Sequence, residues 1–134
     1  MRSRVNQDVR TLIVEDNATF RQSFKGILCT GFPLMVIEEA ADAKEALQKV
    51  NTFRPDLIFM DIKLPGESGL KLTEKIRAND SSVIIIILTS YDLPEYRQAA
   101  QQYGANYFIS KDSSSREEIL ELVECILSKC RTKS

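Results

Sequence analysis

Short runs of β-branched and other apolar residues alternate with segments of helical periodicity five times along this chain. The runs span residues 11–14, 35–37, 57–60, 83–88 and 107–109, and they are mostly apolar throughout. Such runs are typical of parallel strands covered by helices on both faces, whereas half-exposed strands alternate in polarity. Five strand-then-helix repeats within 134 residues therefore predict an open parallel α/β sheet with five helices. A closed eight-stranded barrel needs roughly twice this length.

Between the strands, apolar residues recur with the spacing of amphipathic helices, and capping residues mark where helices begin. Asp42 and Glu45 have the spacing of a capping box, and the last helix begins at Ser114 or Ser115, with glutamates placed to complete a second box. Gly104 marks the end of the fourth helix. The five predicted apolar stripes are Phe20, Phe24, Ile27 and Leu28; Ala43, Ala46, Leu47 and Val50; Leu72, Thr73 and Ile76; Tyr96, Ala99, Ala100 and Tyr103; and Ile119, Leu122, Val123, Ile126 and Leu127.

The composition is that of one ordinary globular domain. We expect a single domain over residues 1–134, with a core at about residues 9–127 and tails at residues 1–7 and 130–134. The net charge of −1 does not favour a protein that coats nucleic acid. The longest aliphatic run, residues 83–88, is far shorter than the about 20 residues of a membrane span, and residues 1–10 do not resemble a secretion signal. We therefore expect a cytoplasmic protein that makes no membrane contact.

Two features of residue usage narrow the chemistry. The chain has no histidine, which excludes Ser-His-Asp catalysis, imidazole metal ligands and phosphohistidine formation on the chain itself. Its three cysteines, Cys29, Cys125 and Cys130, form no CxxC pair, so we predict that they are small buried apolar residues rather than metal ligands or a disulfide framework. Chemistry must then rest on carboxylates, hydroxyls, lysine or backbone groups.

Polar residues follow four of the five predicted strands. Ligands of open parallel sheets bind beyond the carboxyl ends of the strands, so these residues are expected to meet at one edge. They are Glu15 and Asp16 after the first strand, Asp61 after the third, Thr89 and Ser90 after the fourth, and Lys111 after the fifth. Taken singly, most have an ordinary explanation: Glu15 and Asp16, with Asn17, are typical of a helix cap, Thr89 of a strand end and Lys111 of a surface. Asp61 is harder to explain in this way, because it follows an apolar strand and a lone carboxylate there needs a partner.

The coincidence of these residues changes their interpretation. Clustered carboxylates repel one another unless a cation or a proton lies among them, and one lysine offsets only part of their charge. A set of oxygen ligands without nitrogen or sulfur suits Mg²⁺. A metal site beside a carboxylate, with a lysine and a hydroxyl opposite, is an arrangement for phosphoryl transfer.

With these residues, the chain resembles the receiver domains of two-component response regulators. The resemblance covers about residues 9–126 and includes Leu64-Pro65-Gly66 just beyond Asp61. It implies a flavodoxin-like, doubly wound sheet of strand order 2-1-3-4-5. It also implies a signalling phosphoacceptor rather than an enzyme, with a sensor histidine kinase as the phosphoryl donor.

The resemblance also implies a role for each site residue. Asp61 would be the phosphoacceptor, and Mg²⁺ would be held by Glu15, Asp16, Asp61 and the backbone carbonyl of Lys63. Phosphoryl oxygens would be met by Lys111, by the Thr89 hydroxyl and by the Ser90 N–H. Thr89 and Phe108 would form the switch that remodels the face made by the fourth helix, the fifth strand and the last helix. The alternative for Phe108 is an ordinary core residue of its strand. The ring of Phe108 is expected to point inward for at least part of the time, since phenylalanine has no hydroxyl to solvate.

Three positions depart from the commonest family pattern. Asp112 follows Lys111 where many receivers have a proline, usually after a cis peptide, which costs about 2.5–4 kcal/mol without proline. Lys63 and Tyr91 lie two residues after Asp61 and Thr89, where the family tunes the lifetime of the phosphoryl group. A tyrosine at position 91 is expected to screen the phosphoryl group from water and to slow dephosphorylation.

The segment from Leu64 to Leu70 and the Lys111-Asp112 step resemble receivers attached to LuxR-type helix-turn-helix domains. Contact with DNA would then require a C-terminal effector domain, and phosphorylation would favour a homodimer. A phosphatase of the haloacid-dehalogenase type is a weaker alternative, because Lys63 stands where its general acid would be. A flavodoxin-like cofactor binder lacks its phosphate loop, and a module for protein contacts alone is disfavoured by the complete set of site residues.

Overall fold

The structure is a computed structural model that describes residues 9–133, so the predicted tail at residues 1–7 lies outside the described residues. Five parallel strands form one sheet in the order β2-β1-β3-β4-β5, which confirms the predicted topology. The elements follow one another as β1 (Arg10–Val14), α1 (Ala18–Gly31), β2 (Val36–Ala40), α2 (Ala43–Phe53), β3 (Leu57–Met60), α3 (Gly69–Asn79), β4 (Ile84–Thr89), α4 (Pro94–Tyr103), β5 (Tyr107–Ser110) and α5 (Arg116–Lys133).

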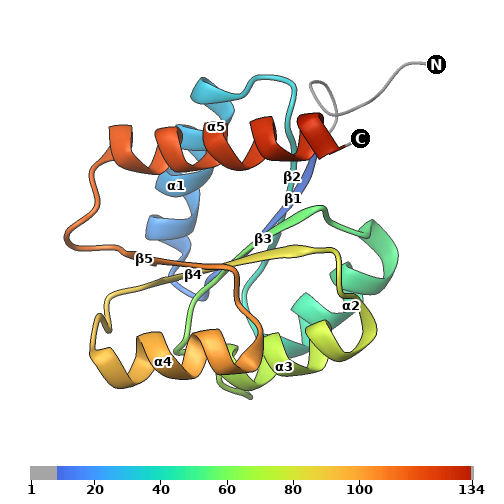
Figure 1. The fold of residues 1–134 in the computed structure, drawn as a ribbon. Helices are drawn as coiled ribbons and strands as arrows, with labels where there is room; N and C mark the ends of the chain where they lie inside the picture. The colour runs from blue at the N-terminus through green and yellow to red at the C-terminus, as the bar shows by residue number, and fades with distance from the viewer. Residues whose placement is uncertain (1–8, 134) are drawn as a thin grey trace.

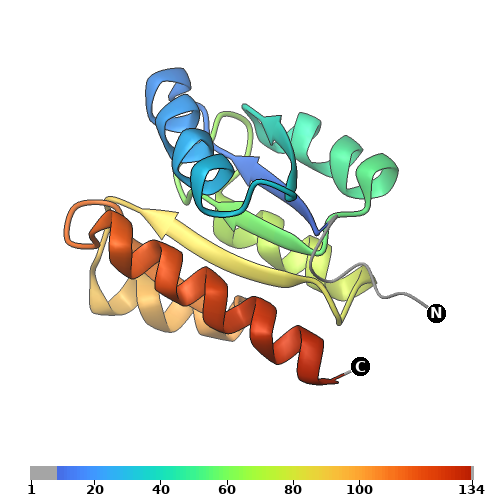
Figure 2. The same ribbon diagram turned by 90° about the horizontal axis from the view of Figure 1, so that it is seen from above.

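The helices form two layers, one on each face of the sheet. Figure 1 shows α1 and α5 above the sheet and α2, α3 and α4 below it, and Figure 2 shows α1 and α5 from above. Because successive strand residues point to opposite faces, Leu12 and Val14 of β1 pack toward α2–α4, while Ile13 packs toward α1 and α5. The central strands are buried on both faces, as their continuous apolar sequences predict.

The predicted capping residues lie at the starts of the helices. The side chain of Asp42 accepts a hydrogen bond from the N–H of Glu45 at 2.8 Å, and Ser115 and Glu118 exchange two hydrogen bonds of a capping box. Gly104 ends α4 with φ = 104°, a conformation that favours glycine. The predicted stripes pack against the core, apart from Ile27, which is half-buried and lies in neither core cluster.

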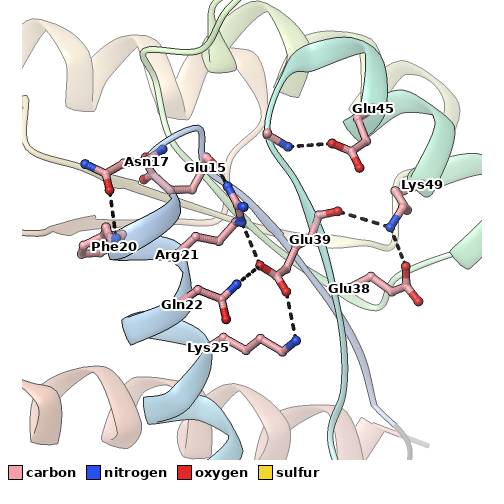
Figure 3. A network of polar contacts seen from close by, with 11 residues as sticks. Glu15, Asn17, Phe20, Arg21, Gln22, Lys25, Glu38, Glu39, Glu45 and Lys49 are labelled. Atoms are coloured by element: carbon pink, nitrogen blue, oxygen red, sulfur yellow. Dashed lines mark hydrogen bonds and ion pairs between the residues drawn. The ribbon is translucent and has the colours of Figure 1, made fainter.

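The edge strand β2 is longer than predicted, because two glutamates lie in it. The sequence analysis expected residues 35–37, whereas the strand runs from Val36 to Ala40. Glu38 and Glu39 point to opposite sides of the sheet, and basic side chains of the neighbouring helices neutralise both (Figure 3). Glu39 accepts hydrogen bonds from Arg21 at 2.8 Å and Lys25 at 2.9 Å, both on α1. These ion pairs hold the second half of the edge strand, which the sequence analysis did not include, against α1 and α2.

The ion pairs around Glu39 predict a dependence of stability on pH. Burial acts to raise the pKa of Glu39, but the hydrogen bonds from Lys25 and Arg21 outweigh it and hold the pKa below its ordinary value. A lowered pKa stabilises the fold above the pKa of the unfolded chain, about 4.3, and this stability is lost as the pH falls through the folded-state pKa. We expect Glu39→Gln to lower the free energy of unfolding by about 1 kcal/mol at pH 7. In urea titrations at pH 7 and pH 3, that difference should shrink at the lower pH.

Glu74→Gln is the matched control for this experiment, because Glu74 is exposed and its ammonium partner Lys71 lies 3.8 Å away. It should change the free energy of unfolding by less than about 0.5 kcal/mol at either pH. An equal loss for Glu39→Gln at both pH values would contradict the assignment of the stabilisation to the ionised carboxylate.

Two sequence-based predictions about the fold are wrong. Residues 130–133 continue α5 to Lys133 where a tail was predicted. Cys29 and Cys125 are exposed rather than buried, because each lies beside a core residue of its helix and so points away from the sheet. The side chain of Cys130 lies outside the described part of the structure. Among the described residues, no helix combines the length and the apolar character needed to cross a membrane.

Candidate functional site

Two neighbouring strands bring Glu15 and Asp61 together at the carboxyl edge of the sheet. β1 and β3 pair in register, with Val14 opposite Met60, and the N–H of Asp61 donates to the carbonyl of Val14 at 3.0 Å. The residues that follow each strand therefore leave the sheet side by side. One carboxylate oxygen from each of Glu15, Asp16 and Asp61 lies within 4.8 Å of the others. The structure thus confirms that these three acids meet at one edge of the sheet.

Lys111 lies among these acids, beyond the end of β5. Its backbone N–H donates to the carbonyl of Thr89 at 2.9 Å, which ties the residue to the end of β4. Its ammonium donates to Oε1 of Glu15 at 2.5 Å and to Oδ2 of Asp61 at 3.4 Å. Only 13% of the Lys111 side chain is exposed. One buried ammonium thus bridges two carboxylates that come from different strands.

The three acids differ in their surroundings. Glu15 and Asp61 are buried, while Asp16 is exposed. Burial raises the pKa of Glu15, against the opposing effect of the hydrogen bonds from Lys111 and from the N–H of Asn17. Oδ1 of Asp61 accepts the N–H of Ile62 at 2.8 Å, so Oδ2 is the oxygen that faces Lys111. The paired strands and the lysine together hold Oδ2 of Asp61 beside the Lys111 ammonium.

These acids are not the cap of the first helix, which was their ordinary alternative. Asn17 is the N-cap of α1, and its side-chain oxygen accepts the N–H of Phe20 at 3.0 Å. Glu15 and Asp16 therefore keep oxygens that face the site. Three carboxylates and a single ammonium leave excess negative charge, and the donor atoms are all oxygen, so the set fits Mg²⁺.

The residues predicted to form the switch lie on the neighbouring strands β4 and β5. Thr89 is fully buried, and its hydroxyl accepts the N–H of Tyr91 at 3.2 Å. Phe108 is half-buried and packs against the α2–α4 side of the core. The guanidinium carbon of Arg97 lies 4.6 Å from the centroid of the Phe108 ring, and Asp92 holds Arg97 through hydrogen bonds of 2.6 and 3.2 Å. The ring is therefore neither fully exposed nor fully enclosed.

The two residues predicted to tune phosphoryl lifetime contact each other. The ammonium of Lys63 lies 5.0 Å from the centroid of the Tyr91 ring and 6.0 Å from that of Tyr96. The two tyrosine rings meet edge to face at 6.1 Å. This contact joins the loop after β3 to the loop after β4. Ser90, which was predicted to donate its N–H, is exposed and directly follows the end of β4.

Sequence reasoning missed three residues around the site. Arg21 donates to the carbonyl of Glu15 at 2.6 Å and connects the site to Glu39 of the edge strand (Figure 3). Phe20, which the sequence placed in an apolar stripe, has its ring against Lys111. Gly69, at the start of α3, packs directly on the backbone of Asp61. Only Gly69 had a signal in the sequence, as a glycine between a helix cap and a buried leucine. All peptide bonds in the described residues are trans, including that between Lys111 and Asp112.

Comparison with known proteins agrees with this geometry. A family model described as the response regulator receiver domain matches residues 11–124 of the chain. The chain belongs to this family. This receiver domain also resembles receivers of LuxR-family regulators, as its sequence motifs indicated.

Individual relatives and solved structures are similar to this receiver domain over most of its length. It is 36% identical over 115 residues to the oxygen regulatory protein NreC of Staphylococcus aureus (strain JH9), in a match that covers 85% of this chain and 53% of the relative. A CheY-like receiver domain from Methanospirillum hungatei JF-1 is 30% identical with a TM-score of 0.83, covering 93% and 98% of the two chains. A LuxR-family response regulator from Aurantimonas sp. SI85-9A1 is 31% identical with a TM-score of 0.81, covering 90% and 85%.

Family membership settles the broad class of the protein. It is a receiver domain of response regulators, a signalling module rather than a conventional enzyme, and receiver domains bind Mg²⁺ at an acidic pocket like that of Glu15, Asp16 and Asp61. The haloacid-dehalogenase and flavodoxin alternatives are thereby set aside. The chain spans about half the length of the curated relatives that it matches.

Proposed function

We propose that this domain accepts a phosphoryl group on Oδ2 of Asp61 from a phosphohistidine of a sensor kinase. The observation that supports this most strongly is the bridge that Lys111 makes between Glu15 and Asp61, because it holds a carboxylate oxygen and a positive charge together at the carboxyl edge of the sheet. A histidine kinase is the expected donor because the chain has no histidine of its own.

The transfer is an in-line displacement in which Asp61 is the nucleophile. A carboxylate oxygen of Asp61 forms a bond to phosphorus while the bond from phosphorus to the imidazole nitrogen breaks, and the nitrogen leaves with the electron pair. The ammonium of Lys111 pairs with an oxygen of the transferring group. The Thr89 hydroxyl and the Ser90 N–H donate to the others. Because the Lys111 ammonium already lies beside Asp61, charge that develops on the nearest phosphoryl oxygen meets a donor without rearrangement of solvent.

Glu15, Asp16 and Asp61, with the backbone carbonyl of Lys63, would hold the Mg²⁺ of the family. When bound, the ion supplies positive charge to the phosphoryl oxygens and offsets the repulsion among the carboxylates. The chain's own part is to fix these oxygens on two paired strands. Burial of Glu15 and Asp61 strengthens their attraction for any cation at the site.

Phosphorylation adds about one to two negative charges and new hydrogen-bond acceptors beside Thr89. We propose that the Thr89 hydroxyl moves toward them, and that Phe108 moves into the space it leaves. This would displace Arg97 from the ring and remodel the α4-β5-α5 face. The partner that binds that face would be a second copy of the domain or a DNA-binding effector domain in a longer chain.

Mass spectrometry after incubation with Mg²⁺ and acetyl phosphate tests the proposed acceptor. We expect an adduct of about 80 Da, one phosphoryl unit, on the wild type and none on Asp61→Asn. Hydroxylamine should remove the adduct, because it cleaves acyl phosphates and leaves phosphate esters of serine or threonine intact. The control Glu74→Gln removes an exposed acid of α3 and should keep the adduct. An adduct of equal yield on Asp61→Asn would overturn the proposal.

The contact between Lys63 and Tyr91 predicts a slow loss of the phosphoryl group. The Tyr91 ring is 44% exposed and is held by Lys63 and Tyr96 near the end of β4, where it would screen the phosphoryl group from water. We expect Tyr91→Ala to shorten the half-life of phosphorylated Asp61 several-fold, measured by decay of the adduct after removal of acetyl phosphate. Tyr91→Phe keeps the ring and should keep the half-life. An unchanged half-life in Tyr91→Ala would remove the basis for this prediction.

A further inference from the structure

The ammonium of Lys111 has a third neighbour besides the two carboxylates. It lies 4.3 Å from the centroid of the Phe20 ring, a distance at which a cation is attracted to the face of an aromatic ring. The ammonium has three donor hydrogens, and the oxygens of Glu15 and Asp61 take two of them. The ring thus contacts a side chain that is central to the site, although Phe20 itself carries no polar group.

Phe20 is fixed in place by the core. Its ring stacks on Phe24 with a centroid distance of 5.9 Å and an interplanar angle of 13°. Phe24 in turn meets Phe59 of β3 edge to face at 4.8 Å, and both of these rings are almost fully buried. Phe59 lies in β3, two residues before Asp61, which directly follows the strand. A continuous set of aromatic contacts therefore runs from the strand that precedes Asp61 to the ammonium that faces it.

A lysine at such a site needs a restraint. Its side chain is long and has many rotamers, and its ammonium already lies closer to Glu15 than to Asp61. If the ammonium followed Glu15 alone, it would leave the atom that receives the phosphoryl group. A ring that contacts it from α1 confines the ammonium without adding a hydrogen-bond partner that would compete with phosphoryl oxygens.

We propose that Phe20 is a positioning residue that holds the Lys111 ammonium at Asp61 through a cation–π contact. The inference rests on the proposed phosphoacceptor function of Asp61. Phe20 acts only through Lys111 and has no contact with the reacting atoms. The alternative is that Phe20 merely fills space in the apolar stripe of α1, as the sequence suggested.

Three variants separate these roles. Phe20→Leu keeps an apolar side chain but removes the ring, and Phe20→Tyr keeps the ring. Phe32→Leu is the matched control, because Phe32 is also half-buried and packs against the same core cluster at the far end of α1. We expect the initial rate of adduct formation with acetyl phosphate to fall about two- to tenfold in Phe20→Leu. It should stay near that of the wild type in Phe20→Tyr and Phe32→Leu.

A double-mutant comparison shows whether the effect passes through Lys111. In a Lys111→Met background, Phe20→Leu should slow the residual reaction no further, whereas a space-filling role would give the same loss in both backgrounds. A second measurement needs neither metal nor phosphate. In the NMR spectrum of the metal-free protein, the ring current of Phe20 should shift the Lys111 ε-methylene protons upfield. Phe20→Leu should abolish that shift, and Phe20→Tyr should keep it.

The outcomes distinguish this inference from the function on which it rests. If the wild type takes up a phosphoryl group on Asp61 but Phe20→Leu reacts as fast as Phe20→Tyr, the positioning role is wrong and the proposed function stands. A further loss of rate on adding Phe20→Leu to Lys111→Met would also overturn the positioning role. If the wild type forms no hydroxylamine-sensitive adduct, the proposed function fails and takes the positioning role with it.

Discussion

Replacement of Gly69 by alanine is expected to lower the free energy of unfolding by about 3 kcal/mol. A Cβ atom at this position would lie far inside van der Waals contact with the carbonyl oxygen of Asp61, 2.9 Å from its carbonyl carbon and 3.1 Å from Cγ of Met60. The obstacle is mainly backbone, so no side-chain rotation relieves it. The N–H of Gly69 also donates to the carbonyl of Ile62 at 2.8 Å, which holds the start of α3 against this segment.

The control for this prediction has the opposite sign. Gly26 lies inside α1, and a Cβ atom added there would have no neighbouring atom within 4 Å. Gly26→Ala should therefore raise the free energy of unfolding by about 0.5–1 kcal/mol through helix propensity. Urea denaturation of the two variants measures both effects. Because the shift in Gly69→Ala moves the backbone of Asp61, adduct formation with acetyl phosphate should slow as well. A Gly69→Ala protein as stable as the wild type would show that α3 is not seated on the acceptor strand in this way.

The sequence predicts how the elements are arranged, but not which side chains meet between them. The parallel sheet and the meeting of the acids follow from runs of apolar residues and from the polar residues that come after them, because parallel strands place all their carboxyl ends at one edge. The strand order itself was implied by the resemblance to receiver domains. These predictions need only the order of elements. The contact of Phe20 with Lys111 needs the rotation of α1 about its axis, which the packing of Phe24 on Phe59 determines.

Residue type misled the sequence analysis where a neighbour decides the environment. The predicted second strand ended before Glu38 and Glu39, yet both lie in β2, where Lys49, Arg21 and Lys25 neutralise them from two helices. Statistics for cysteine predicted burial, but Cys29 lies on the outer side of its helix. In each case the deciding atoms are distant in sequence, or depend on which face of a helix meets the sheet. The local propensity of a residue reflects neither its distant neighbours nor the face of the helix on which it lies.

The second large effect is expected at Arg77 of α3, whose side chain joins three segments far from the site. Its Nε donates to the carbonyl of Gly104 at 3.0 Å, and one terminal nitrogen donates to the carbonyls of Asp80 and Val83 at 3.2 and 2.7 Å. The other terminal nitrogen donates to Oδ1 of Asn106 at 2.7 Å, and that oxygen also accepts the N–H of Ile85. Burial lowers the pKa of Arg77, yet the guanidinium stays charged at neutral pH.

Arg77→Ala is therefore expected to lower the free energy of unfolding by about 2–4 kcal/mol. The substitution removes hydrogen bonds from a charged donor and leaves several partly buried acceptors without a partner. Arg77→Lys should recover only part of this, since one ammonium does not reproduce a planar fork that donates in three directions. Lys71→Ala, on the exposed face of the same helix, is the control and should change stability by less than about 0.5 kcal/mol. Urea denaturation measures all three. Equal losses for Arg77→Ala and Lys71→Ala would mean that the loops before β4 and β5 are held by packing alone, without the guanidinium.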